Sequence, residues 1–281
     1  MYFSLGSNKV KTNFIDLYCR SYALADLTKD NCFNKIKSSY INIISNYIPI
    51  ELTGIGEDVP FLRVNDGERC IKLCKEYNLS RLDDLSQTDI IKNSTYDVSD
   101  RAMMQYLEAL DYIKNQSKDL YEVFSLVINV IFFMRSQEAS GGSTSGLPGV
   151  IWVNPKTHWS IEDRAEFLIH EMTHNLLFIE EIIRGLYSYD GMYREENWTR
   201  SAVLNKFRPL DKSFHSAVVG TEILLYRNEF NLEQNKYCAH PPTDKLLSQT
   251  YDSLESCLDS HLLSKRGREI LGACKKELEG I

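Results

Sequence analysis

Residues 160–185, SIEDRAEFLIHEMTHNLLFIEEIIRG, contain the strongest structural signal in this chain. Ser160 and Asp163 have the spacing of a capping box, in which each side chain accepts a hydrogen bond from the other residue's backbone N–H. We therefore expect a helix to begin at Ile161. Apolar residues then recur at intervals of three and four, and Gly185 is suited to end the helix after about Arg184.

The sequence His170-Glu171-Met172-Thr173-His174 lies inside this predicted helix. Two histidines four positions apart project from one helix face, so their ring nitrogens can converge on a metal ion about 2 Å away. Glu171 can reach a water bound to such an ion. The motif predicts a metal site at His170 and His174. The alternative is a pair of histidines that are hydrogen-bonded within the core.

A metal site needs further ligands beyond these two histidines. A metzincin would have Gly and His where this chain has Leu177 and Glu180, so that class is excluded. His215 is attractive because we expect it in the first turn of a second helix. The other candidates are Glu222, Asp190, Glu195 and Glu196. We expect His158, His240 and His261 to be surface or core residues.

Two segments resemble a known family. Residues 208–215, RPLDKSFH, follow the motif helix, and His215 comes 41 positions after His174. Residues 148–151, PGVI, precede the helix as a predicted strand. Both resemble the HExxH-type peptide β-hydroxylases, 2-oxoglutarate-dependent proteins encoded in biosynthetic clusters for ribosomally made peptides (RiPPs). The resemblance covers about residues 147–229. Asp211 and Lys212 stand where the family usually has small residues.

The resemblance implies an Fe(II) site formed by His170, His174 and His215. It also implies a 2-oxoglutarate co-substrate and a peptide substrate, which could be a precursor that bears a leader. Three open positions on the iron would take the keto acid and dioxygen. The distal carboxylate of the keto acid needs a cation, and Arg208 is the candidate. Glu171 would then assist from outside the ligand set.

Two other functions remain open. In a zinc metallopeptidase, His170 and His174 would bind Zn²⁺ with His215 or Glu222, and Glu171 would be the general base. In a binding protein, the metal would be structural or absent. In either enzyme, the aromatic and acidic segment 187–198 could line a groove for a peptide.

The composition narrows the class of protein. The chain has 281 residues, with 39 acidic and 32 basic side chains and a formal charge of −7, which argues against a nucleic-acid-binding protein with a basic surface. The seven cysteines are scattered, and we expect them to be reduced thiols. The first residues lack a signal-peptide pattern, and the longest apolar run, Val123–Met134, is too short to span a bilayer. We expect a cytoplasmic protein without a membrane partner.

The predicted fold is mainly α with a small β-sheet (α+β), and the motif helix packs near a short strand as in zincins. We expect a mainly helical region at 1–139 and a metal-binding catalytic region at 147–281, with one continuous domain as the alternative. Residues 140–146, SGGSTSG, suggest a flexible loop or a lid. The other predicted elements are helices over Glu68–Tyr77 and Asp100–Asn115 (capped by Asp100), a strand or buried helix over Val123–Met134, a strand over Gly149–Asn154, a helix from about Asp211 or Ser213 to Glu229, and one or two helices over Pro241–Ile281.

Overall fold

The structure, a computed structural model, describes residues 2–21, 32–52, 62–64, 67–79, 91, 98–137, 139–232 and 239–281. The chain divides into two compact units. Unit 1 contains residues 1–10 and 159–281, and unit 2 contains residues 11–158. The division therefore falls after residue 158, whereas the sequence suggested a boundary between 139 and 147.

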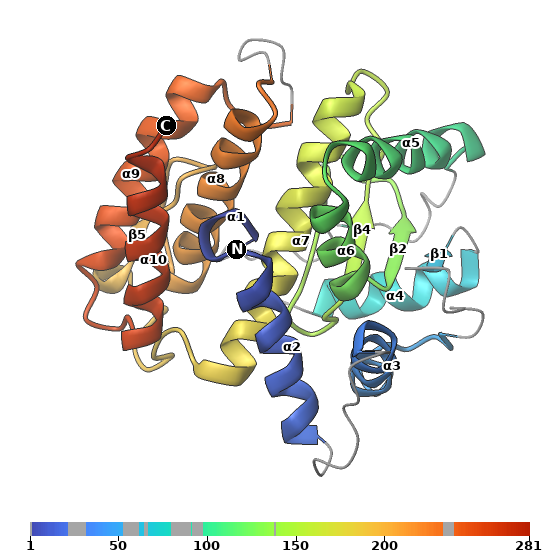
Figure 1. The fold of residues 1–281 in the computed structure, drawn as a ribbon, viewed down its shortest axis with the longest axis horizontal. Coiled ribbons are helices and arrows are strands. Elements are labelled where there is room, and N and C mark those ends of the chain that lie inside the picture. Colours follow the sequence, from blue (N-terminus) through green and yellow to red (C-terminus); the bar gives the residue numbers. More distant parts are fainter. Residues whose placement is uncertain are drawn as a thin grey trace. The chain divides into compact units, whose positions relative to one another are not determined.

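The described residues of unit 2 form a four-stranded sheet with the order β1-β2-β4-β3. Strands β1, β2 and β4 are parallel, and β3 runs antiparallel to β4. Every residue of β2 and β4 is buried, which explains their uninterrupted apolar sequences. Because β4 pairs with β2, the residues of β4 belong to unit 2, and the boundary between the units lies after them. The elements are α2 (Ser7–Ser21, which starts in unit 1), α3 (Cys32–Ile44), β1 (Leu62–Val64), α4 (Gly67–Leu79), α5 (Asp100–Gln116), α6 (Lys118–Val127), β2 (Val130–Phe133), β3 (Gly141–Gly142) and β4 (Val150–Val153) (Figure 1).

Lys37 fixes the junction between α6 and β2. Its ammonium group donates hydrogen bonds to the backbone oxygens of Ser125, Leu126 and Ile128 at 2.5, 3.2 and 3.3 Å. These carbonyls lie where the helix ends, so they would otherwise lack partners. The ambiguous run Val123–Met134 thus contains both the end of a helix and a strand.

Unit 1 is helical around the motif helix α7. The helix extends from Ile161 to Arg184, and the expected capping box of Ser160 and Asp163 is present. Helices α8 and α9 pack against each other and α7 packs against α8. None of the helices in the described ranges is long and apolar enough to cross a membrane. The elements are α1 (Tyr2–Leu5), α7 (Ile161–Arg184), the 3-10 helix η3 (Glu195–Asn197), β5 (Thr199–Arg200), β6 (Phe207–Arg208), α8 (Leu210–Glu229), α9 (Thr243–Leu258) and α10 (Lys265–Leu278).

The structure confirms a mainly helical protein with a small sheet. Two local expectations were wrong. Ser99, rather than Asp100, caps α5, because its hydroxyl accepts the N–H of Ala102. Segment 140–146 is not a simple loop, because Gly141 and Gly142 pair with Val153 and Trp152 as a strand.

The cysteine prediction is tested at four positions. Cys70, Cys74, Cys257 and Cys274 are free and buried. The side chains of Cys19, Cys32 and Cys238 lie outside the described residues.

Candidate functional site

Helix α7 brings His170 and His174 together. Because they are one turn apart, their Nε2 atoms lie 3.0 Å from each other. Two nitrogens at right angles on one metal ion, each ~2.1 Å from it, would be ~3.0 Å apart. Burial lowers the pKa of both imidazoles well below the usual value, and nearby histidines lower it further. Both rings are therefore neutral at neutral pH and can offer lone pairs.

His215 meets the other edge of the His174 ring. It lies on α8, and its Nδ1 is 2.9 Å from Nδ1 of His174. Burial lowers the pKa of His215 to about 3. The three predicted ligands are thus in contact, but His174 turns one nitrogen to His170 and the other to His215. In the parts of the chain that are described, no group of three or more His, Cys, Asp or Glu side chains has the arrangement of a metal site.

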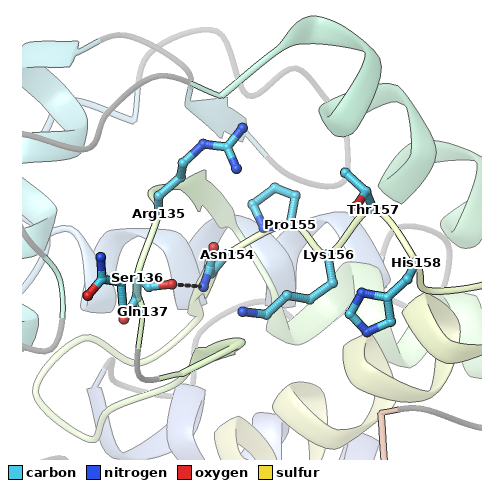
Figure 2. Close-up of a pocket in the computed structure, with 8 residues that line it drawn as sticks. All are labelled: Arg135, Ser136, Gln137, Asn154, Pro155, Lys156, Thr157 and His158. Carbon is cyan, nitrogen blue, oxygen red and sulfur yellow. Dashed lines mark hydrogen bonds between the residues drawn. The ribbon is translucent and has the colours of Figure 1, made fainter.

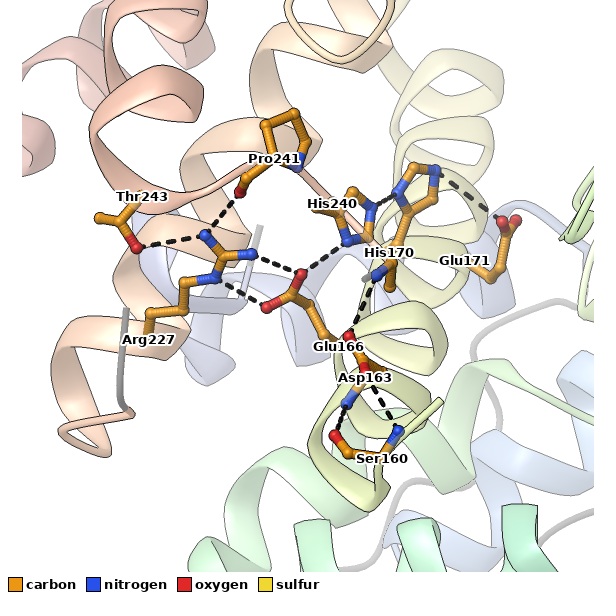
Figure 3. A network of polar contacts seen from close by, with 10 residues as sticks. Ser160, Asp163, Glu166, His170, Glu171, Arg227, His240, Pro241 and Thr243 are labelled. Atoms are coloured by element: carbon orange, nitrogen blue, oxygen red, sulfur yellow. Dashed lines mark hydrogen bonds and ion pairs between the residues drawn. The ribbon is translucent and has the colours of Figure 1, made fainter. Parts of the chain in front are cut away.

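His240 belongs to the same cluster; it is a core residue, as one of the two expected positions, but it also contacts the motif histidine His170. Its Nε2 lies 2.7 Å from Nδ1 of His170, and the two rings stack with centroids 4.9 Å apart. Its Nδ1 lies 2.7 Å from Oε1 of Glu166, one turn before His170 on α7 (Figure 3). Nδ1 of His170 therefore contacts His240, which in turn contacts the carboxylate of Glu166.

Arg227 holds the Glu166 carboxylate. Its Nε and one terminal nitrogen donate to the two carboxylate oxygens, each at 2.8 Å, and both side chains are almost fully buried (Figure 3). Burial raises the pKa of Glu166, but His240 and Arg227 lower it more, so the net pKa is below the usual value. Glu166 is consequently a fixed, ionised hydrogen-bond acceptor.

Tyr187 and Glu181 lie at the other end of the cluster. The Tyr187 hydroxyl is 3.5 Å from Nε2 of His215, and burial and then the nearby charge of Glu181 raise its pKa well above the usual value. Glu181, near the end of α7, accepts a hydrogen bond from the hydroxyl of Tyr189 at 2.7 Å. The chain of polar contacts thus begins at Glu166 and ends at Tyr187.

The protons in this chain can be counted. Five contacts join, in order, Glu166, His240, His170, His174, His215 and Tyr187. Four neutral imidazoles and one phenol supply five protons, one for each contact.

A metal ion between the Nε2 atoms of His170 and His174 would take the place of the proton in that one contact. Each of these histidines can then donate its other N–H away from the ion, toward His240 on one side and His215 on the other. Metal-bound histidines usually have such partners. The donor set, two neutral imidazoles of which one is backed by His240 and Glu166, therefore suits a divalent transition metal at the His170–His174 pair.

Arg208 and Glu171 lie close to the histidines. The pKa of His174 is lowered mainly by burial. The neighbouring His170 and His215 lower it further, and so do the positive charges of Lys212 and Arg208. The Glu171 carboxylate is buried, with Oε1 3.8 Å from Nε2 of His170. The histidine cluster thus has positive charges near it, from Lys212 and Arg208, and one carboxylate, that of Glu171.

The remaining candidates have other positions. Glu222 is buried and accepts hydrogen bonds from the backbone N–H groups of Phe3 and Ser4 at 2.9 and 3.0 Å, so it anchors α1. Asp190, Glu195 and Glu196 are exposed to solvent.

Sequence reasoning missed Glu166, His240 and Tyr187 as members of the cluster. Glu166 had a signal, because it lies four residues before His170 and so shares its helix face. His240 and Tyr187 had none, because only the packing of unit 1 brings them to α7.

Comparison of the sequence with protein-family models and with curated proteins finds no match.

Substitution of Arg227 by Met should strongly destabilise unit 1. It leaves the Glu166 carboxylate buried without its cation, so we expect a loss of ~3–5 kcal/mol in the free energy of unfolding, measured by urea denaturation. The double variant R227M/E166Q should recover part of the loss.

The pH dependence gives a second readout of this pair. Because the folded pKa of Glu166 is lowered, its contribution to stability is present above its unfolded pKa and is lost as the pH falls through the folded value. Glu166→Gln should reduce this acid sensitivity. Equal stabilities of wild type and R227M would contradict the assignment.

Proposed function

We propose that this chain is an Fe(II)- and 2-oxoglutarate-dependent oxygenase that hydroxylates a side chain of a peptide, with the metal at His170 and His174. The observation that supports it best is the Nε2 pair at 3.0 Å, together with the contacts that lead from His170 through His240 to Glu166. When bound, the iron would supply the redox chemistry that couples oxidative decarboxylation of the keto acid to hydroxylation.

The protein's own residues would orient the ligands. His170 would donate its Nδ1–H to His240, and His240 would donate to Glu166. His174 would donate its Nδ1–H to His215. These bonds fix which ring nitrogen faces the ion and increase its basicity. His215 as third ligand stays a prediction, since its observed contact favours a role as the partner of His174.

The charges beside the cluster favour an anionic co-substrate. Arg208 is nearly buried, and its charge and that of Lys212 act on His174. A guanidinium can hold both oxygens of a carboxylate, which suits the distal end of 2-oxoglutarate. The same cations would also disfavour a second metal ion nearby.

Segment 187–198 and its neighbours supply a surface for a peptide. Tyr187 contacts His215, and the adjacent Tyr189 is exposed, as are Tyr193 and Phe207. Exposed aromatic side chains suit a peptide partner, because they provide apolar area with few rotatable bonds. We infer that a ribosomally made precursor, from RiPP biosynthesis in the cytoplasm, is the substrate. The free thiols Cys257 and Cys274 are compatible with a reducing compartment.

A zinc metallopeptidase is the second candidate, and one contact favours it. The Glu171 carboxylate lies 3.8 Å from the metal-facing nitrogen of His170, where a general base could act on a metal-bound water.

Glu171→Gln separates the two functions. A peptidase should lose ~10²–10⁴-fold of its turnover, because the general base is gone. The oxygenase should retain most of its succinate formation with Fe(II), 2-oxoglutarate, ascorbate and a candidate peptide in air. Absence of succinate and of a product with one added oxygen, across a panel of peptides, would contradict the oxygenase.

Arg208→Gln tests the co-substrate site. Loss of a charge-assisted hydrogen bond should raise the KM for 2-oxoglutarate ~10–100-fold with a smaller change in kcat. Arg268→Gln, at an exposed arginine of α10 in the same unit, is the matched control. An unchanged KM in Arg208→Gln would exclude Arg208 from this role.

Metal titration distinguishes ligands from partners. His170→Ala or His174→Ala should abolish stoichiometric binding of Co(II), used as a spectroscopic substitute for iron. His215→Ala and His240→Ala should weaken binding only ~10–100-fold, because each removes a partner of a ligand. His261→Ala, at an exposed histidine, should have no effect. Complete loss of metal in His215→Ala would make it the third ligand.

A further inference from the structure

Unit 2 contains a cavity of its own at one edge of the sheet. Its volume is about 350 Å³, and it lies between residues 135–137, which follow β2, and residues 154–158, which follow β4 (Figure 2). Pockets for small molecules typically have volumes of this order or somewhat larger. The cavity lies apart in sequence from the histidine cluster and had no role in the proposed function.

The parallel sheet explains the location of the cavity. Phe133 and Val153, the last residues of β2 and β4, are paired, so both segments leave the sheet at the same edge. Open sheets of parallel strands bind their ligands beyond the carboxyl ends of the strands.

Side-chain hydrogen bonds hold the two segments in place. The amide nitrogen of Asn154 donates to the backbone oxygens of Ser136 and Ala139 at 2.7 and 2.5 Å. The indole of Trp152 donates to the backbone oxygen of Met134 at 3.1 Å. The rim is therefore ordered by the protein's own bonds and does not need a ligand to form.

The lining is positively charged. Arg135 and Lys156 come from opposite segments, and His158 lies beside Lys156 (Figure 2). Ser136 and Thr157 add hydroxyl groups. None of the eight residues that line the cavity has a carboxylate, although the whole chain has a formal charge of −7. Burial lowers the pKa of Lys156, which indicates that this ammonium group is partly withdrawn from water.

We propose that this cavity binds a small molecule through an oxyanion, a phosphate or a carboxylate group. Arg135 can hold two oxygens of either group at once, while Lys156 approaches from the other segment as a point charge. The inference is independent of the metal site, because every lining residue belongs to unit 2.

Calorimetric titration at constant ionic strength, with pyrophosphate and succinate as probes and without added metal, tests this proposal. We expect one of them to bind wild-type protein with a Kd below ~1 mM. The double variant R135Q/K156Q should weaken this binding at least ~10-fold. The matched control R101Q/K118Q removes the same two charges from exposed positions on α5 and α6 and should bind as wild type does.

Preference for pyrophosphate would identify a phosphate ligand, and preference for succinate would identify a carboxylate ligand. If a probe still binds R135Q/K156Q as it binds the wild type, the proposal is overturned. This includes the case in which succinate binds at the histidine cluster instead of the cavity. Equal weakening in both double variants or no binding up to ~10 mM would also overturn it. If R135Q/K156Q does not fold by circular dichroism, His158→Gln, at an exposed position, takes its place with the same expected direction.

Discussion

The ion pair between Glu166 and Arg227 is the interaction on which unit 1 depends. Both groups are almost completely withdrawn from water, so each charge needs the other to offset the cost of burial. Arg227 also donates to the backbone oxygen of Pro241 and to the hydroxyl of Thr243, at 3.0 and 3.2 Å. One guanidinium thus joins α7, α8 and the start of α9. The same carboxylate receives His240, so the group that holds the helices together also orients the first histidine.

One helix supplies three of the groups in the histidine cluster. Glu166, His170 and His174 follow one another at intervals of four residues on α7, so they share one helix face. His215, His240 and Tyr187 come from outside this helix. Because a carboxylate only accepts, Glu166 turns the Nδ1–H of His240 toward itself and leaves Nε2 of His240 to accept from His170.

Local signals in the sequence were sufficient to predict helix α7 and to place the two motif histidines on one face of it. The capping box and Gly185 predicted the bounds of α7, since both act within a few residues of the helix ends. The strands were harder, because the run Val123–Met134 changes from helix to strand at a point that Lys37, far away in sequence, determines. His240 could not be assigned for the same reason. Its partners lie 70 and 74 residues earlier, and periodicity does not extend across such separations.

The anchoring of α1 by Glu222 has a consequence for synthesis on the ribosome. The backbone of Ser4 and the carboxylate that receives it are 218 residues apart in sequence. At ordinary translation rates of 5–20 residues per second, residues 2–5 would wait ~10–40 s before their partner is made. Residues 2–5 thus dock long after they are made, and until then the apolar ring of Phe3 is available to chaperones.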